Sequence, residues 1–211
     1  MKHLILDFDG TIADSFDETL AVFNLITNRP NPLSSAEIAH LRTLSMTQVM
    51  RALGLKPWQV PILLFKGRRH MTARMAGIKP FPGLDPTFAQ LNREGYQLHI
   101  ISTNSAPNIH AFLRTHQLDR HFQTVTGSIG LIKSRALRKL LRQLRAAPSD
   151  CVYIGDETRD VDAAHAVHMP VLAVAWGFNA PSALAAHHPT GLVQTPADLA
   201  ALTKKALLEQ S

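Results

Sequence analysis

Two aspartates, Asp7 and Asp9, directly follow the short apolar run at residues 4–6. Side chains alternate along a strand, so both carboxylates are expected to point the same way. Two neighbouring carboxylates repel each other unless a cation lies between them. Carboxylate oxygens suit Mg²⁺, which commonly also binds a substrate phosphate. The pair therefore predicts a metal-assisted active site at the end of the first strand.

Further polar residues stand where other predicted strands end. They are Thr103 and Asn104 after residues 97–102, Asp156 and Asp160 after residues 151–155, and Lys133 behind the glycine-containing loop 127–130. A carboxylate nucleophile, a second carboxyl group, a hydroxyl donor and a lysine together suit phosphoryl transfer. Ser102 offers the same hydroxyl chemistry as Thr103, so the sequence leaves open which of the two binds phosphate.

Short apolar, β-branched runs alternating with helix-like segments must position these residues. We expect strands at residues 2–7, 97–102, 123–126, 151–155 and 171–175. Strands separated by helices form right-handed crossovers and hence an α/β fold with a doubly wound, mainly parallel (Rossmann-like) sheet. Ligands bind beyond the carboxyl ends of the strands in such folds. The candidate residues therefore fall on the edge where a ligand is expected.

Residues 14–81 interrupt this alternation. Helices are indicated by Phe16, Leu20 and Phe23 on one face, by a capping box of Ser34 and Glu37, and by residues 46–53 and 58–75. The segment 80–83, rich in proline and glycine, is expected to return the chain. We therefore predict a small α-helical cap domain at 14–81, inserted after the first strand, and a catalytic core of 1–13 and 82–211.

The composition indicates the cellular compartment and the kinds of partner that we expect for this protein. The 211 residues carry a formal net charge of +6 and one cysteine, Cys151, which we expect to be buried. A lone cysteine fits a reducing compartment, and no signal-like or membrane-spanning stretch is visible, so we expect a cytoplasmic protein. The charge suits a small phosphorylated metabolite. The basic segment 133–145 lacks aromatic residues, so nucleic acid is not an expected partner. Monomer and homodimer both stay open.

Taken together, the motifs resemble those of the haloacid dehalogenase superfamily. Residues 7–11, Asp-Phe-Asp-Gly-Thr, are similar to its first motif. Thr103, Lys133, and Asp156 with Asp160 resemble the second, third and fourth motifs in order. The resemblance covers essentially the whole chain and is closest to phosphoglycolate-phosphatase-like members with a helical cap. The chain departs from the pattern at Ser134, where the family often has proline.

This resemblance implies a Mg²⁺-dependent phosphatase that hydrolyses a small organic phosphomonoester, similar to phosphoglycolate, through an aspartyl-phosphate. Asp7 would be the nucleophile, and Asp9 would act as acid and then as base. The phosphoryl group would be bound by Thr103, Asn104 and Lys133. The Mg²⁺ ligands would be Asp7, the backbone carbonyl of Asp9, and Asp156, with Asp160 acting directly or through a water or Lys133.

Residues outside the four motifs are expected to contribute less. Arg42 lies between two predicted cap helices and could bind a substrate carboxylate or second phosphate; an ordinary surface arginine is the alternative. We interpret the basic cluster at residues 66–70 as a solvated helix end. Glu157 is interpreted as a surface residue beside the site.

The presence of Asp9 also indicates which reactions to expect. A leaving alcohol needs an acid whereas a leaving halide does not, so dehalogenation is not expected. Phosphonate cleavage would require a cap lysine such as Lys56 or Lys66 as a Schiff base, and nothing marks either as buried. A phosphomutase shares the aspartyl-phosphate and stays an alternative. A non-catalytic binding or regulatory module with this fold is the second alternative.

Overall fold

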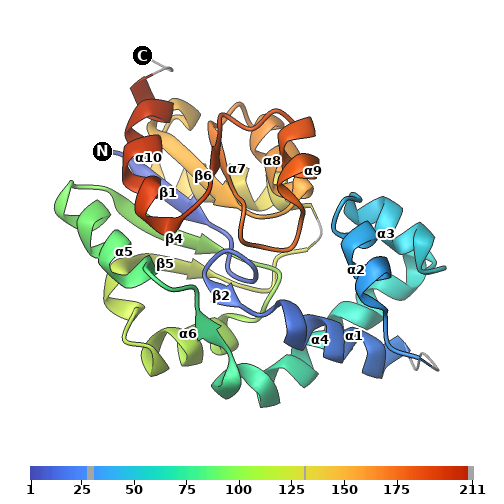
Figure 1. The fold of residues 1–211 in the computed structure, drawn as a ribbon. Coiled ribbons are helices and arrows are strands. Elements are labelled where there is room, and N and C mark those ends of the chain that lie inside the picture. Colours follow the sequence, from blue (N-terminus) through green and yellow to red (C-terminus); the bar gives the residue numbers. More distant parts are fainter. Residues whose placement is uncertain (28–30, 131, 209–211) are drawn as a thin grey trace.

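A parallel sheet forms the centre of the molecule (Figure 1). The computed structural model describes residues 1–27, 31–130 and 132–208. Within these ranges six strands pair in the order β5-β4-β1-β6-β7-β8, all parallel. They are β1 (His3–Leu6), β4 (Gln97–Ile101), β5 (Phe122–Thr126), β6 (Cys151–Gly155), β7 (Val171–Val174) and β8 (Gly191–Val193). The predicted doubly wound, mainly parallel sheet is confirmed.

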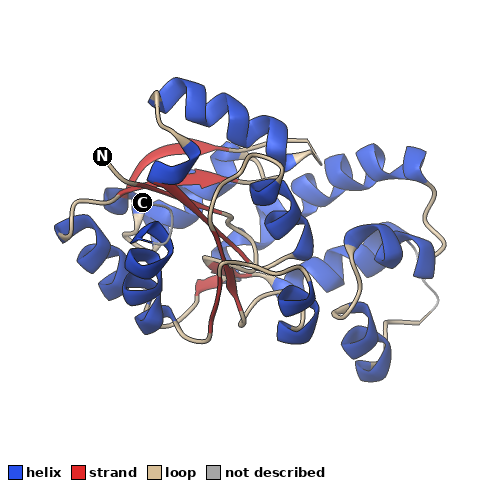
Figure 2. Ribbon diagram, turned by 90° about the horizontal axis from the view of Figure 1, so that it is seen from above, coloured by secondary structure: helices blue, strands red, loops and turns tan. Residues whose placement is uncertain are grey.

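Helices cover both faces of the sheet (Figure 2). The core helices are α5 (Leu84–Arg93), α6 (Ala106–Thr115), α7 (Lys133–Leu144), α8 (Thr158–His165), α9 (Pro181–Ala186) and α10 (Leu199–Leu208). Alternation along β1 sends Leu4 and Leu6 into one apolar cluster, with residues of α5, α6 and α10. Ile5 enters the other cluster, with residues of α7, α8 and α9. Both faces of β1 are therefore buried, as a central parallel strand requires.

Most predicted elements agree with the structure to within one or two residues. Helix α7 shows the expected leucine face, with Leu137, Leu140 and Leu141 buried. Strand β8 was not predicted because its three residues are too short a run to show a pattern. Short 3₁₀ helices also occur at 57–59, 75–77, 119–121, 148–150 and 196–198.

In the part of the chain that the structure describes, four α-helices lie between β1 and β4 in the sequence. They are α1 (Phe16–Thr27), α2 (Ser35–Leu41), α3 (Met46–Ala52) and α4 (Val60–Arg74), and we call them the helical insert. The insert begins and ends at an antiparallel pair, β2 (Ala13–Asp14) with β3 (Lys79–Pro80). The predicted capping box of Ser34 and Glu37 is confirmed at the start of α2. The division into domains at 13/14 and 81/82 stays a prediction.

Within the insert the helices are packed unequally. Helix α1 packs along α4, whereas α2 and α3 lie as a second layer beside them (Figure 1). Neither α2 nor α3 contains a buried residue. A helix usually gains most of its stability by burying an apolar face. The apolar residues of α2 and α3 therefore remain partly uncovered.

The composition led to two expectations, one about the single cysteine and one about membrane-spanning stretches. Cys151 is buried in β6, and burial raises the pKa of its thiol to about 12, so it is an inert core residue as expected. Among the helices that the structure describes, none has the length and apolar character needed to cross a membrane.

Candidate active site

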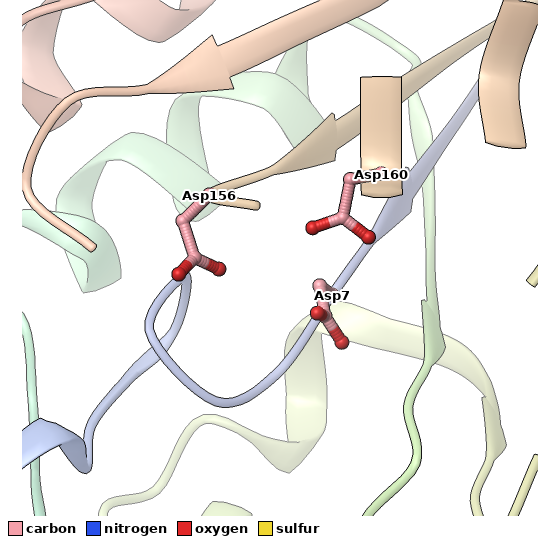
Figure 3. A group of neighbouring side chains, drawn as sticks. All are labelled: Asp7, Asp156 and Asp160. Carbon is pink, nitrogen blue, oxygen red and sulfur yellow. The ribbon is translucent and has the colours of Figure 1, made fainter. Parts of the chain in front are cut away.

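Three buried carboxylates meet at the carboxyl edge of the sheet. Asp7 follows β1, Asp156 follows β6, and Asp160 lies in the first turn of α8. One oxygen of each lies within 4.8 Å of the others, and Figure 3 shows the three side chains pointing toward a common space. Strands β1 and β6 are neighbours in parallel register, so the residues that follow them necessarily come together. This meeting of distant segments was predicted from the strand ends.

Lys133 at the start of α7 is the counter-charge of this group. Its buried ammonium contacts Asp7 Oδ2 and Asp160 Oδ1. Asp160 also accepts hydrogen bonds from the Tyr153 hydroxyl (3.2 Å) and the Glu157 backbone N–H (3.0 Å). A buried charge without partners would cost several kcal/mol, on the order of 3–5 when one partner of a buried pair is removed. Lys133 and Asp160 thus hold each other in place.

Asp156 is fixed by two donors and two glycines. Thr11 Oγ1 donates to Asp156 Oδ1 and the Phe178 backbone N–H to Oδ2, each at 2.7 Å. A Cβ on Gly10, which has a φ of +77°, would lie 2.1 Å from Asp156 Oδ2. A Cβ on Gly177 would lie 2.2 Å from the Asp156 Cβ. Both glycines are required because the backbone approaches the carboxylate too closely for any side chain.

The group carries more negative than positive charge. Burial raises the pKa of Asp7 to about 7 although Lys133 opposes the rise. Burial, with the charges of Glu157, Asp160 and Asp7, raises the pKa of Asp156 well above its ordinary value. Burial alone would lower the pKa of Lys133, but the adjacent Asp160 and Asp7 outweigh it and keep the lysine protonated. Three oxygen-ligand side chains with an excess of buried negative charge fit a divalent cation such as Mg²⁺.

Asp9 lines the same cavity as Asp7 but has different partners. Its carboxylate accepts hydrogen bonds from Ser15 Oγ (2.9 Å) and Asn104 Nδ2 (3.0 Å). Burial raises its pKa, while these two hydrogen bonds oppose the rise. A raised pKa helps a carboxyl group to act as an acid. Asp9 is thus not a member of the three-carboxylate group, and its role in proton transfer stays a prediction.

The loop after β4 contains both candidate hydroxyl residues. Thr103 lines the cavity together with Asp7 and Asp9. Ser102 is buried, and its hydroxyl accepts a hydrogen bond from the Asn104 backbone N–H at 3.0 Å. Ser102 is not among the residues that line the cavity, whereas Thr103 is; Thr103 as the phosphate-binding residue stays a prediction. Asn104 is oriented toward the site by its bond to Asp9.

Two arginines of the insert donate to backbone carbonyls of the core. Arg42 donates to Gly177 O (2.8 Å) and Phe178 O (3.0 Å). Arg68 donates to Thr103 O (2.7 Å) and Ile129 O (3.2 Å). The interpretation of residues 66–70 as a solvated helix end is therefore wrong for Arg68, because its partly buried guanidinium makes a long-range contact that the sequence does not reveal. Arg42 lines the cavity, so a role in substrate binding stays a prediction.

Sequence reasoning missed a pair that lies between two of the clustered aspartates. Glu157 is only 7% exposed, so its interpretation as a surface residue is wrong. Its carboxylate contacts the guanidinium of Arg159, which lines the cavity with Asp7 and Thr103. Burial would lower the pKa of Arg159, but Glu157, Asp160 and Asp7 hold it above its ordinary value. The available signal was position: any residue between Asp156 and Asp160 must lie beside the site.

Comparison with known proteins agrees with this geometry. Residues 4–174 match the family described as haloacid dehalogenase-like hydrolases. The chain belongs to this family. The resemblance predicted from the four motifs is thereby confirmed, and so is a hydrolase as the class of protein.

Individual relatives place the chain within this family. It is 38% identical to a phosphoglycolate phosphatase of Synechococcus elongatus over 94% of this chain and 95% of the relative. It is 28% identical to the tyrosine-protein kinase PtkA of Mycobacterium tuberculosis over 83% of this chain and 62% of that protein. The crystal structure of a predicted phosphatase from Clostridium acetobutylicum superposes with a TM-score of 0.83 at 19% identity, covering 97% and 98% of the two chains. This last likeness shows the fold alone.

Proposed function

We propose that this protein is a Mg²⁺-dependent phosphatase that hydrolyses a small organic phosphomonoester through an aspartyl-phosphate on Asp7. The observation that carries the proposal is the buried group of Asp7, Asp156, Asp160 and Lys133 at the edge of a cavity. The relative from Synechococcus is named a phosphoglycolate phosphatase, which makes phosphoglycolate the first compound to test.

Each step of the reaction has a side chain in reach. Asp7 attacks phosphorus, and the bond to the alcohol oxygen breaks as Asp9 gives that oxygen a proton. Asp9 then takes a proton from a water molecule, whose oxygen attacks the phosphorus of the aspartyl-phosphate. This second attack releases inorganic phosphate and restores the Asp7 carboxylate. Thr103 and Asn104 bind the phosphoryl oxygens, and Lys133 offsets their charge.

The metal ligands in this proposal are the Asp7 carboxylate, the Asp9 backbone carbonyl and Asp156. When bound, Mg²⁺ offsets negative charge and orients the phosphoryl group against Asp7. Asp160 already receives hydrogen bonds from Lys133, Tyr153 and Glu157. These contacts support a role for Asp160 in positioning Lys133 rather than in binding the metal directly.

The decisive experiment measures phosphate release. The purified protein is assayed with p-nitrophenyl phosphate, phosphoglycolate and a broad phosphomonoester panel, with Mg²⁺ and after chelation. We expect Mg²⁺-dependent turnover that falls by at least about 10⁴-fold in Asp7→Asn, because the nucleophile is lost. The exposed Asp14→Asn is the matched control and should retain activity. Absence of Mg²⁺-dependent turnover across the panel, or full activity of Asp7→Asn, would overturn the proposal.

In this proposal the helical insert is a cap domain that spans residues 14–81. All four of its helices contribute to the cavity that reaches Asp7, which supports a role in choosing the substrate. A cytoplasmic setting is also part of the proposal, supported by the single buried cysteine.

A further inference from the structure

The cavity at the site extends well beyond the phosphoryl group. Its volume is about 350 Å³, within the range of roughly 300–1,000 Å³ typical of pockets that hold drug-sized organic molecules. Asp7, Asp9, Thr103 and Arg159 lie at one end. Most of the remaining lining consists of apolar side chains from all four helices of the insert, among them Leu20, Phe23, Ile38, Val49, Met50 and Leu63, with Thr19, Arg42 and Arg68 as polar members. We call this apolar part the chamber.

The apolar side chains that line the chamber are not fully covered by other parts of the protein. Each of the six apolar side chains named above is only half-buried. Neither α2 nor α3, which supply Ile38, Val49 and Met50, buries a single residue. Protein interiors are normally packed as densely as organic crystals. An apolar space of this size beside a reactive carboxylate is therefore suited to an apolar ligand group.

The charged residues near the chamber are already engaged. Arg42 and Arg68 also line the cavity, but each donates two hydrogen bonds to backbone carbonyls of the core. Arg159 contacts Glu157 at the phosphoryl end. Along the chamber the remaining polar partners are few, chiefly Thr19 and the N–H groups of Arg42 and Arg68 that the core carbonyls do not use. Burial of an extended polar substrate body there is therefore less favourable than burial of an apolar one.

We infer that the substrate is a phosphomonoester whose organic part is an apolar chain or ring, larger than the two-carbon acid of phosphoglycolate. The phosphoryl group binds at Asp7 and the apolar part fills the chamber. This inference rests on the proposed phosphatase function and narrows its substrate.

The first test is a series of n-alkyl phosphates from methyl to hexyl, with phosphoglycolate alongside. Full burial of a methylene improves transfer from water by about fourfold. We expect kcat/KM for hexyl phosphate to exceed that for methyl phosphate and that for phosphoglycolate by at least about tenfold. A flat or falling series, or phosphoglycolate as the best substrate, overturns the inference while leaving the phosphatase proposal intact.

The second test fills the chamber. Met50→Trp should bring the ratio of kcat/KM for hexyl phosphate to that for methyl phosphate close to one, because the indole ring occupies the space that the alkyl chain would fill. Thr47→Trp on the same helix is the matched control, since Thr47 is exposed and does not line the cavity. It should keep the wild-type series. If Met50→Trp and wild type show the same series, the chamber does not bind the organic part.

The third test uses no variant and no turnover. Binding of n-alkylphosphonates to the wild-type protein is followed by calorimetry, and the heat-capacity change should become more negative as the chain lengthens. Affinity that is independent of chain length overturns the inference even if the protein proves to hydrolyse no phosphomonoester. Chain-length-dependent binding without any hydrolysis would overturn the phosphatase proposal, and the inferred substrate with it, while showing that the chamber binds an apolar chain.

Discussion

The two walls of the cavity are built in opposite ways. On the core wall, Asp7 lines the cavity and belongs to a buried group with Asp156, Asp160 and Lys133, each of which contacts another core residue. On the insert wall, half-buried apolar side chains face the cavity and no residue of α2 or α3 is buried. The outer face of α4 even leaves Phe65 70% exposed.

This difference follows from what each wall has to do. Charged groups that act on a reacting bond must be held rigidly, because a small misplacement costs much of the rate. An apolar wall needs only area, since hydrophobic contact has no directional requirement. The core therefore defines the reaction, and the insert is free to define which organic group is accepted.

Lys133→Met should have the broadest effect, since it lowers both stability and turnover by disrupting the buried group at Asp7. It leaves Asp7 and Asp160 buried without their cation, which should lower the free energy of unfolding by about 3–5 kcal/mol in the absence of metal. Turnover should fall by about 10²-fold as charge stabilisation is lost. Denaturant unfolding and steady-state kinetics measure both. Lys139→Met, exposed on the same helix, is the control; equal stability of the two variants would contradict the buried-pair argument.

Asp9→Asn tests whether the core wall separates metal binding from proton transfer. We expect turnover to fall by about 10³-fold because the acid is lost. Mg²⁺ affinity, measured by calorimetry, should stay within a few-fold of wild type, because the proposed metal contact is the backbone carbonyl. Ser15→Ala removes one hydrogen bond to the same carboxylate and should change turnover far less. Loss of Mg²⁺ binding in Asp9→Asn would make its carboxylate a ligand.

Arg159→Met tests whether a charged core residue that lines the cavity binds the substrate. The guanidinium lines the cavity beside Asp7, so we expect it to bind substrate oxygens. Loss of a charge-assisted hydrogen bond of about 1.5 kcal/mol should raise KM by about tenfold with little change in kcat. Arg135→Met, exposed on α7, is the control. An unchanged KM would leave Arg159 a partner of Glu157 only.

Phe65→Ser on the insert should have the smallest effect. Because the side chain is largely exposed, the free energy of unfolding should change by no more than about 0.5 kcal/mol. Phe88→Ser, at a fully buried position of the core, should instead cost about 3–5 kcal/mol. Thermal and denaturant unfolding of both variants gives the contrast. A large loss in Phe65→Ser would show that this face of α4 is covered by something in solution.

The sequence predicted the core better than the insert for a physical reason. Asp7, Thr103 and Asp156 each interrupt an apolar run, and the geometry of a parallel sheet brings such interruptions together. Lys133 was found by its position behind the glycine-containing loop 127–130 and by its match to the third motif. Arg68 and Glu157 were misjudged because their burial depends on contacts between segments that no local pattern encodes. The chamber was not foreseen, since apolar residues that line a cavity have the same spacing as apolar residues that fill a core.

The contacts of Arg42 and Arg68 determine which substitutions would break the hydrogen bonds between the insert and the core. Their acceptors are the carbonyls of Thr103, Ile129, Gly177 and Phe178, which every amino acid carries. Replacing the side chain of Thr103, Ile129 or Phe178 removes no acceptor, so these contacts persist as long as the loops keep their path. Gly177 is different, because any Cβ there would lie too close to Asp156. Replacing either arginine removes the donors outright. On the core side, the corresponding donors are Asn108, which donates to Arg68 O, and Asn179, which donates to Arg42 O and Leu44 O. The junction is therefore most sensitive to substitution at these four side-chain donors.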